Sequence, residues 1–166
     1  MKVTESVPSE ERLGLIHAVA DDAATLLNVD PAADSPLDVM SKVNDAIVDL
    51  VFGRPTPAAQ DENPHLLLGA LWGAQMVRQF GWYWADVVID DQFQEVAVIA
   101  PQQEMIMFPF AFTDACINKQ CICTVLLAFN MLLAKDRMGE TPVGSYTNVM
   151  LHVHHIIPPY TLEDEE

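Results

Sequence analysis

The N-terminal half opens with two segments in which apolar residues recur three and four positions apart, the spacing of one helix face. The first segment predicts a helix over residues 10–27, with Ser9 as its N-cap. The second predicts a helix over residues 36–51, with Ser35 as its N-cap and a proline at its first position. Residues 1–9 precede both patterns without any period, and we expect them to be a flexible lead-in.

A third segment, residues 66–80, is apolar around most of its circumference, so it predicts a helix at the centre of the core. Gly69 and Gly73 lie one turn apart on this helix, and Gly81 follows it as a C-terminal stop. A glycine costs about 1 kcal/mol in a helix interior relative to alanine. We therefore expect another element to approach the backbone closely at Gly69 and Gly73.

After Gly81 the apolar period changes from that of a helix to two, which predicts a strand over residues 82–89. Two further β-rich runs follow at 95–100 and 104–110, separated by short turns at 90–94 and 101–103. Connections this short join antiparallel neighbours, so the three runs predict a meander. Alternation places Tyr83, Ala85, Val87 and Ile89 on one face of the first strand and Trp82, Trp84, Asp86 and Val88 on the other.

The C-terminal third predicts a short helix over 113–117 and a long apolar helix over 122–138. Residues 145–155 alternate weakly, which favours a last edge strand, and residues 158–166 read as a flexible acidic tail. The whole chain of 166 residues is therefore predicted to be one α+β domain, a small antiparallel sheet of three to four strands packed against about five helices. Alternating βαβ units are absent, which excludes a doubly wound nucleotide-binding sheet.

The acidic net charge and its distribution along the chain limit the possible binding partners. The chain carries 24 Asp and Glu against 8 Lys and Arg, a formal net charge of −16, and a field of that sign repels nucleic acid and anionic membranes. No base occurs between Arg78 and Lys119, where six acidic residues fall: Asp86, Asp90, Asp91, Glu95, Glu104 and Asp114. This pattern favours a basic protein partner, although general acidity that aids solubility accounts for it as well. No apolar run suits a membrane span or a signal peptide, so we expect a cytoplasmic protein.

The sequence offers no recognised catalytic motif, and we predict a protein without enzymatic activity or cofactor. Imidazole and thiolate are ligands that zinc prefers, and the chain offers His152, His154, His155, Cys116, Cys121 and Cys123. The cysteine spacing is not that of a zinc knuckle, however, and an odd count of three argues against a disulfide framework. We expect the cysteines to be small core residues and the histidines to lie on a half-exposed edge.

The predicted strand and hairpin supply the candidate binding residues. Two tryptophans on one strand face beside an aspartate would suit a protein interface, but a helix that covered them would make the same rings part of the core. Two of the hairpin carboxylates occupy a turn, where aspartate is common for conformational reasons alone. The candidate partner-binding residues are Trp82, Trp84, Asp86, Asp90, Asp91 and Glu95.

The segment LGALWGAQMVRQFGWYWADV, followed later by IMFPF, resembles a family of small uncharacterised bacterial domains with an LGxxxG helix, a GWxW strand and a Phe-Pro strand. The resemblance covers about a third of the chain, and it rests on Leu68, Gly69, Gly73, Gly81, Trp82, Trp84, Phe108 and Pro109. Domains of this kind are similar to immunity proteins that neutralise secreted toxins. The resemblance implies a fold and a binding role, and no catalytic residues.

The leading functional hypothesis is therefore an acidic immunity or inhibitor protein that occludes a basic secreted toxin, as a monomer or a homodimer. A type III-like secretion chaperone is the alternative, because such proteins are also small and acidic and expose apolar patches to an unfolded effector; the eight methionines would suit adaptable surfaces. A metal-binding protein that uses the C-terminal histidines is the second alternative.

Overall fold

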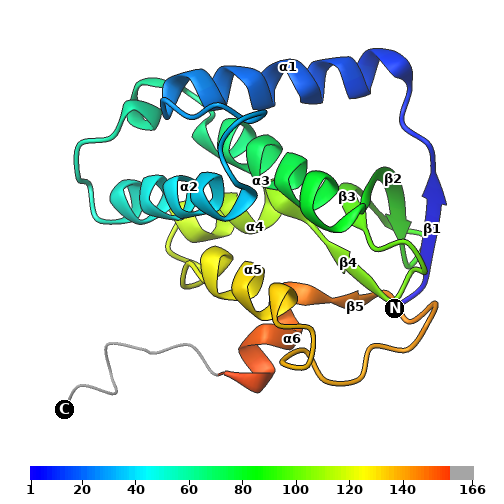
Figure 1. Cartoon of the computed structure of the whole chain (residues 1–166). Helices are drawn as coiled ribbons and strands as arrows, with labels where there is room; N and C mark the ends of the chain where they lie inside the picture. The colour runs from blue at the N-terminus through cyan, green and yellow to red at the C-terminus, as the bar shows by residue number, and fades with distance from the viewer. Residues whose placement is uncertain (158–166) are drawn as a thin grey trace.

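The computed structural model describes residues 1–157, which form six α-helices, one short 3₁₀ helix and a five-stranded sheet (Figure 1). The predicted α+β class is confirmed, whereas the tail predicted for residues 158–166 lies outside the described residues. The helices are α1 Glu10–Leu26, α2 Pro36–Val51, η1 Pro57–Gln60, α3 Pro64–Phe80, α4 Pro109–Ile117, α5 Val125–Leu133 and α6 Val149–Ile156. The strands are β1 Val3–Ser6, β2 Tyr83–Ile89, β3 Phe93–Ile99, β4 Met105–Met107 and β5 Thr147–Asn148.

Helices α1 and α2 form where their capping residues predict. The Ser9 hydroxyl accepts a hydrogen bond from the backbone N–H of Arg12 at 3.1 Å, and the Ser35 hydroxyl accepts one from Asp38 at 3.1 Å. These bonds satisfy backbone donors that a helix start leaves without an intrahelical partner. Local chemistry therefore sets both starts.

Helix α3 is the centre of the helical layer, packed against α1, α2 and α4. Both of its glycines are buried against other elements, as the sequence predicts. A Cβ added at Gly69 would lie 2.8 Å from the ring of Phe110 and 3.0 Å from the carbonyl oxygen of Pro109, and one added at Gly73 would overlap the indole ring of Trp84. The missing side chains thus let α4 and β2 approach the helix backbone.

The sheet has the order β1-β2-β3-β4-β5, and all of its neighbours are antiparallel except β4 and β5. Strand β5 runs parallel to β4 because α4 and α5 carry the chain back between them (Figure 1). The sheet therefore has five strands, slightly more than the three to four predicted, and one of its four strand pairs is parallel. The predicted alternation of β2 is confirmed, since Trp84 joins the cluster on the helix side and Ala85 joins a second cluster on the other face.

The flexible lead-in predicted for residues 1–9 is wrong, because Val3–Ser6 forms the edge strand β1 along β2. The backbone N–H of Lys2 donates to the Asp90 carboxylate at 2.8 Å, and the backbone N–H of Asp90 donates to the carbonyl of Lys2 at 2.8 Å. The residues of β1, VTES, include only one apolar side chain, so no hydrophobic alternation predicts a strand here. The free edge of β2, more than eighty residues away in sequence, supplies the partner.

Strand β1 is also held by a carboxylate between two phenols. Tyr83 donates to Glu5 Oε1 at 2.8 Å, Tyr146 donates to Glu5 Oε2, and Gln103 donates to the Tyr83 oxygen at 3.1 Å. Burial, and then the bond to Glu5, raises the pKa of Tyr146 from 10.0 to about 12. The cluster ties β1, β2 and the segment before β5 together.

We expect Tyr146→Phe to lower the free energy of unfolding by an amount that depends on pH. The folded state binds the phenol proton more tightly than the unfolded state does, so this contribution is fully present below pH 10 and is lost as pH rises through about 12. Urea unfolding of both proteins over this range should show the difference shrinking. A difference that stays constant up to pH 12 would contradict the assignment.

Four predictions for residues 104–155 were wrong in extent or type. The strand predicted over 104–110 ends at Met107, because Pro109 occupies the first turn of α4, so the helix predicted to begin at Thr113 begins earlier. The helix predicted over 122–138 is shortened to Val125–Leu133, and Lys135 follows it in the left-handed conformation (φ 44°).

The strand predicted over 145–155 is present only as Thr147–Asn148, and the remainder is helix α6. The Asn148 side chain caps this helix by accepting the backbone N–H of Leu151 at 3.3 Å. A short apolar run with weak alternation is compatible with a strand and with a helix, and here the cap decides for the helix.

Candidate functional site

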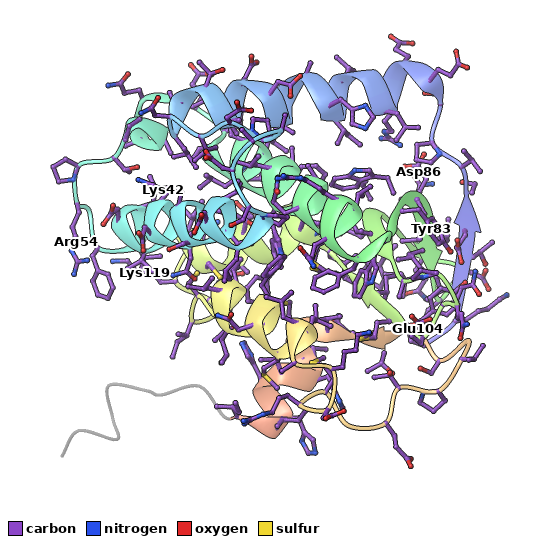
Figure 2. All side chains as sticks on the ribbon, viewed as in Figure 1. Lys42, Arg54, Tyr83, Asp86, Glu104 and Lys119 are labelled. Carbon is purple, nitrogen blue, oxygen red and sulfur yellow. The ribbon has the colours of Figure 1, made fainter. Side chains whose placement is uncertain are left out.

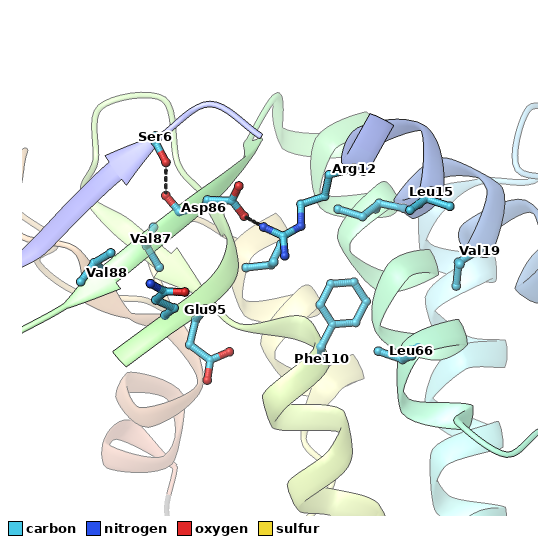
Figure 3. A pocket seen from close by; sticks show the side chains of 13 residues that line it. Ser6, Arg12, Leu15, Val19, Leu66, Asp86, Val87, Val88, Glu95 and Phe110 are labelled. Atoms are coloured by element: carbon cyan, nitrogen blue, oxygen red, sulfur yellow. Dashed lines mark hydrogen bonds and ion pairs between the residues drawn. The ribbon is translucent and has the colours of Figure 1, made fainter. Parts of the chain in front are cut away.

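An open groove of about 800 Å³ lies between α1 and the outer half of the β2–β3 hairpin, and the starts of α3 and α4 contribute to it (Figure 3). Helix α3 packs on β2 at Trp84, where the indole ring lies against Gly73. The part of β2 from Asp86 to Val88 lines the groove instead. The groove is lined by Ser6, Arg12, Leu15, Ile16, Val19, Leu66, Asp86, Val87, Val88, Gln94, Glu95, Val96 and Phe110. Most of this lining is apolar, with carboxylates at the strand side.

Both candidate tryptophans are in the core, which is the alternative that the sequence left open. Trp82 is 4% exposed and Trp84 is 8% exposed. The Trp84 ring stacks on Phe110 with ring centroids 5.7 Å apart, and it also lies against the backbone of Gly73. Neither ring offers a surface to a partner in this structure, so the candidate surface reduces to the four carboxylates.

Asp86 lies in the groove and is paired. Its carboxylate accepts a hydrogen bond from the Arg12 guanidinium at 2.7 Å, and its backbone carbonyl accepts one from the Ser6 hydroxyl at 3.4 Å (Figure 3). Arg12 projects from the first turns of α1, far from Asp86 in the sequence. An acidic residue from the segment without lysine or arginine, residues 79–118, is therefore paired with an arginine from the N-terminal segment. The spacing of charges in the sequence does not reveal this pair.

Asp90 and Asp91 form the tip of the hairpin in the left-handed conformation, with φ of 52° and 57°. Two successive residues of this kind make the turn that best matches the twist of a two-stranded ribbon. The Lys2 ammonium lies 3.1 Å from the Asp91 carboxylate, and the Lys2 backbone binds Asp90. Both residues thus serve strand pairing, and their charge is partly compensated.

Asp90 and Glu95 are the candidate carboxylates without an ion pair among the described residues, and of these Asp90 accepts the Lys2 backbone N–H whereas Glu95 has no hydrogen-bond donor there. It lies on β3 opposite Val87, exposed at the groove edge, and partial burial raises the pKa of its carboxyl group. It also borders a second apolar groove of about 360 Å³ between the hairpin, α4 and α6. Its pairing with Val87 places Glu95 on the sheet face of the second groove, and it reaches the first groove only at the rim.

Charge is unevenly distributed along the molecule. Figure 2 shows Asp86 and Glu104 at the sheet end, whereas Lys42, Arg54 and Lys119 lie at the opposite end. Arg12 lines the groove and Lys2 lies at the hairpin tip, and both bases are paired with carboxylates.

The described residues contain no cluster of three side chains arranged to hold a metal ion. His154 Nε2 lies 2.7 Å from the Thr124 hydroxyl, and His152 Nε2 contacts the backbone carbonyl of Met138. Burial lowers the pKa of His154, which favours its neutral form. Both imidazoles thus join α6 to neighbouring elements, and the three cysteines lie together elsewhere.

Comparison of the chain with models of protein families, with curated proteins and with solved structures found no match. Within residues 1–157, no helix is both long enough and apolar enough to span a membrane.

Proposed function

We propose that this chain is a non-enzymatic binding protein that holds a basic partner protein at the groove between α1 and the β2–β3 hairpin. In its specific form, the proposal is a cytoplasmic immunity or inhibitor protein that occludes a basic secreted toxin. The observation that carries it is an apolar groove edged by the Glu95 carboxylate, which has no counter-ion among the described residues.

The chemistry of the lining defines the partner. Leu15 is 62% exposed and Leu66 is 41% exposed, so burying them against a partner removes apolar surface from water. Glu95 and the Asp86–Arg12 pair add polar groups along the strand side. The matching surface is an apolar segment that carries a lysine or arginine, since opposite charge at an interface speeds encounter and excludes wrong partners.

The second groove favours the chaperone alternative. Phe93 is 62% exposed and Leu151 is 67% exposed beside it, and exposed apolar side chains of this kind are suited to an extended cargo chain. An unfolded cargo would bind without a fixed structure, whereas a toxin would bind folded. The neighbouring coding sequence separates the two, since a toxin gene supports immunity and a secretion effector supports a chaperone.

The binding proposal is tested by selecting peptides from a random displayed library on the purified chain. We expect the selected peptides to combine lysine or arginine with large apolar residues, and to compete with one another for one site. Selection of acidic peptides, or of peptides that still bind after the groove is blocked by Leu15→Arg, would contradict the proposal.

Glu95→Lys should slow association of such a peptide. A change of two charge units about 10 Å from a cation in water is worth about 0.8 kcal/mol, roughly a fourfold change in rate at low salt. The effect should shrink as salt is raised, because exposed charges are screened. Asp45→Lys, exposed on α2 outside the groove, is the matched control. Equal slowing by both variants would show that net charge alone acts and that the groove does not.

A further inference from the structure

All three cysteines of the chain meet at the C-terminal end of α4. Cys116 lies in the last turn of α4 and is fully buried, and its Sγ is 3.6 Å from the Sγ of Cys121. The Cys123 thiol donates a hydrogen bond to Asn44 Oδ1 at 3.4 Å, and the neighbouring Cys116 thiol lowers the pKa of Cys123. Cys121 and Cys123 are half-buried in the segment between α4 and α5. One buried thiol thus lies beside two half-buried cysteines.

The chain reversal after α4 creates this cluster. Lys119 adopts the left-handed conformation (φ 60°), the backbone N–H of Gln120 donates to the carbonyl of Ala115 at 2.8 Å, and that of Lys119 donates to Cys116 at 3.0 Å. This pair of bonds is the Schellman arrangement that ends many helices. It turns the chain back along α4, so that Cys121 and Cys123 return to the turn that holds Cys116.

We propose that Cys116, Cys121 and Cys123 form a thiol site that peroxide oxidises to a disulfide containing Cys116. The site lies at the opposite end of α4 from Phe110, which lines the groove. It is therefore independent of the binding proposed above.

The direction of the two pKa shifts identifies the sulfur that reacts first. The neighbouring Cys116 thiol and the backbone N–H of Val125 lower the pKa of Cys123 by more than burial raises it. The neighbouring Cys123 and burial raise the pKa of Cys116. The thiolate is the nucleophilic form of cysteine. Cys123 is therefore the nucleophile, and Cys116 is the thiol that attacks second.

The chemistry balances in two steps. The Cys123 thiolate attacks one oxygen of hydrogen peroxide, which forms an S–O bond, breaks the O–O bond and releases hydroxide, leaving a sulfenic acid. The Cys116 sulfur then attacks Cys123, which forms the S–S bond and breaks the S–O bond, and the hydroxyl leaves as water with the Cys116 proton. The two sulfurs are oxidised and peroxide is reduced.

The test is a thiol count on the folded chain. Because the sequence holds three cysteines, alkylation followed by intact-mass measurement should find three free thiols in the reduced protein and one after peroxide treatment. Peptide mapping should place Cys116 in the disulfide. Retention of three alkylated thiols, addition of oxygen without a disulfide, or a bond between Cys121 and Cys123 would each overturn the proposal.

Single variants separate the roles. Cys116→Ala should abolish the loss of two thiols, and Cys123→Ala should slow disulfide formation by about an order of magnitude, because the most nucleophilic sulfur is gone. Cys121→Ala is the matched control and should react at the original rate. A Cys116→Ala chain that loses two thiols at the original rate would contradict the central role of Cys116. Thermal melting of each variant verifies that it is folded, and the mapping of the unaltered chain does not depend on the variants.

Discussion

Gly73→Leu is expected to destabilise the fold by more than 3 kcal/mol, the upper end of ordinary overpacking effects. A side chain at this position would overlap the indole ring of Trp84, which is buried and stacked on Phe110. The ring must therefore shift within the core, or α3 and β2 must separate. The midpoint of urea unfolding measures the effect, and an unchanged midpoint would contradict the close approach.

A matched glycine shows that the cost comes from packing. Gly14 lies on α1 with no atom within 4 Å of an added Cβ, so Gly14→Ala should stabilise the protein by up to about 1 kcal/mol through helix propensity. Gly73→Ala should destabilise the protein, although it brings the same gain in helix propensity. Repeating Gly73→Ala in a Trp84→Phe background, where part of the ring is removed, should reduce the cost and complete a double-mutant cycle.

The elements that the sequence predicts well are those set by local chemistry. Ser9, Ser35 and Gly81 fix the ends of the first three helices through bonds to residues a few positions away, and the structure confirms all three helices. The strand period after Gly81 is equally local. Only the glycine spacing in α3 carried long-range information, because a helix glycine without a capping role indicates a close contact.

The elements that the sequence misses depend on distant partners. Strand β1 exists because β2 offers a free edge. Helix α6 is the exception, because its cap, Asn148, is a local signal that the prediction of a strand did not use. The candidate site also depends on distant partners. Asp86 and Asp91 have no basic residue near them in the sequence, but in the fold they pair with Arg12 and Lys2. Glu95 is therefore the better candidate for contact with a basic partner.

The cysteine cluster shows the same limit. The spacing of Cys116, Cys121 and Cys123 matches no metal motif, and it gives no sign that the three sulfurs meet. Their convergence requires the left-handed Lys119 that reverses the chain after α4. Lysine is not a residue that favours this conformation, so no turn motif in the sequence points to the site.

Deletion of residues 2–8 is expected to produce the second large loss of stability. It removes β1, and with it the bonds from Tyr83 and Tyr146 to Glu5 and from Lys2 to Asp90, while Ser9 is kept as the cap of α1. At about 1 kcal/mol for each hydrogen bond, these and the ladder bonds sum to several kcal/mol. The free β2 edge should also make the shortened chain self-associate at high concentration.

Urea unfolding and sedimentation measure the two effects of this deletion. Thr4→Ala, which changes an exposed side chain of β1 and keeps the backbone ladder, is the matched control and should shift stability by no more than about 0.5 kcal/mol. The loss of stability in Glu5→Leu should lie between those of the deletion and of Thr4→Ala, because Glu5→Leu removes the acceptor of both phenols and leaves the strand in place. If the shortened chain unfolds at the original urea concentration, β1 contributes nothing to the fold, and the flexible lead-in expected from the sequence is the correct description.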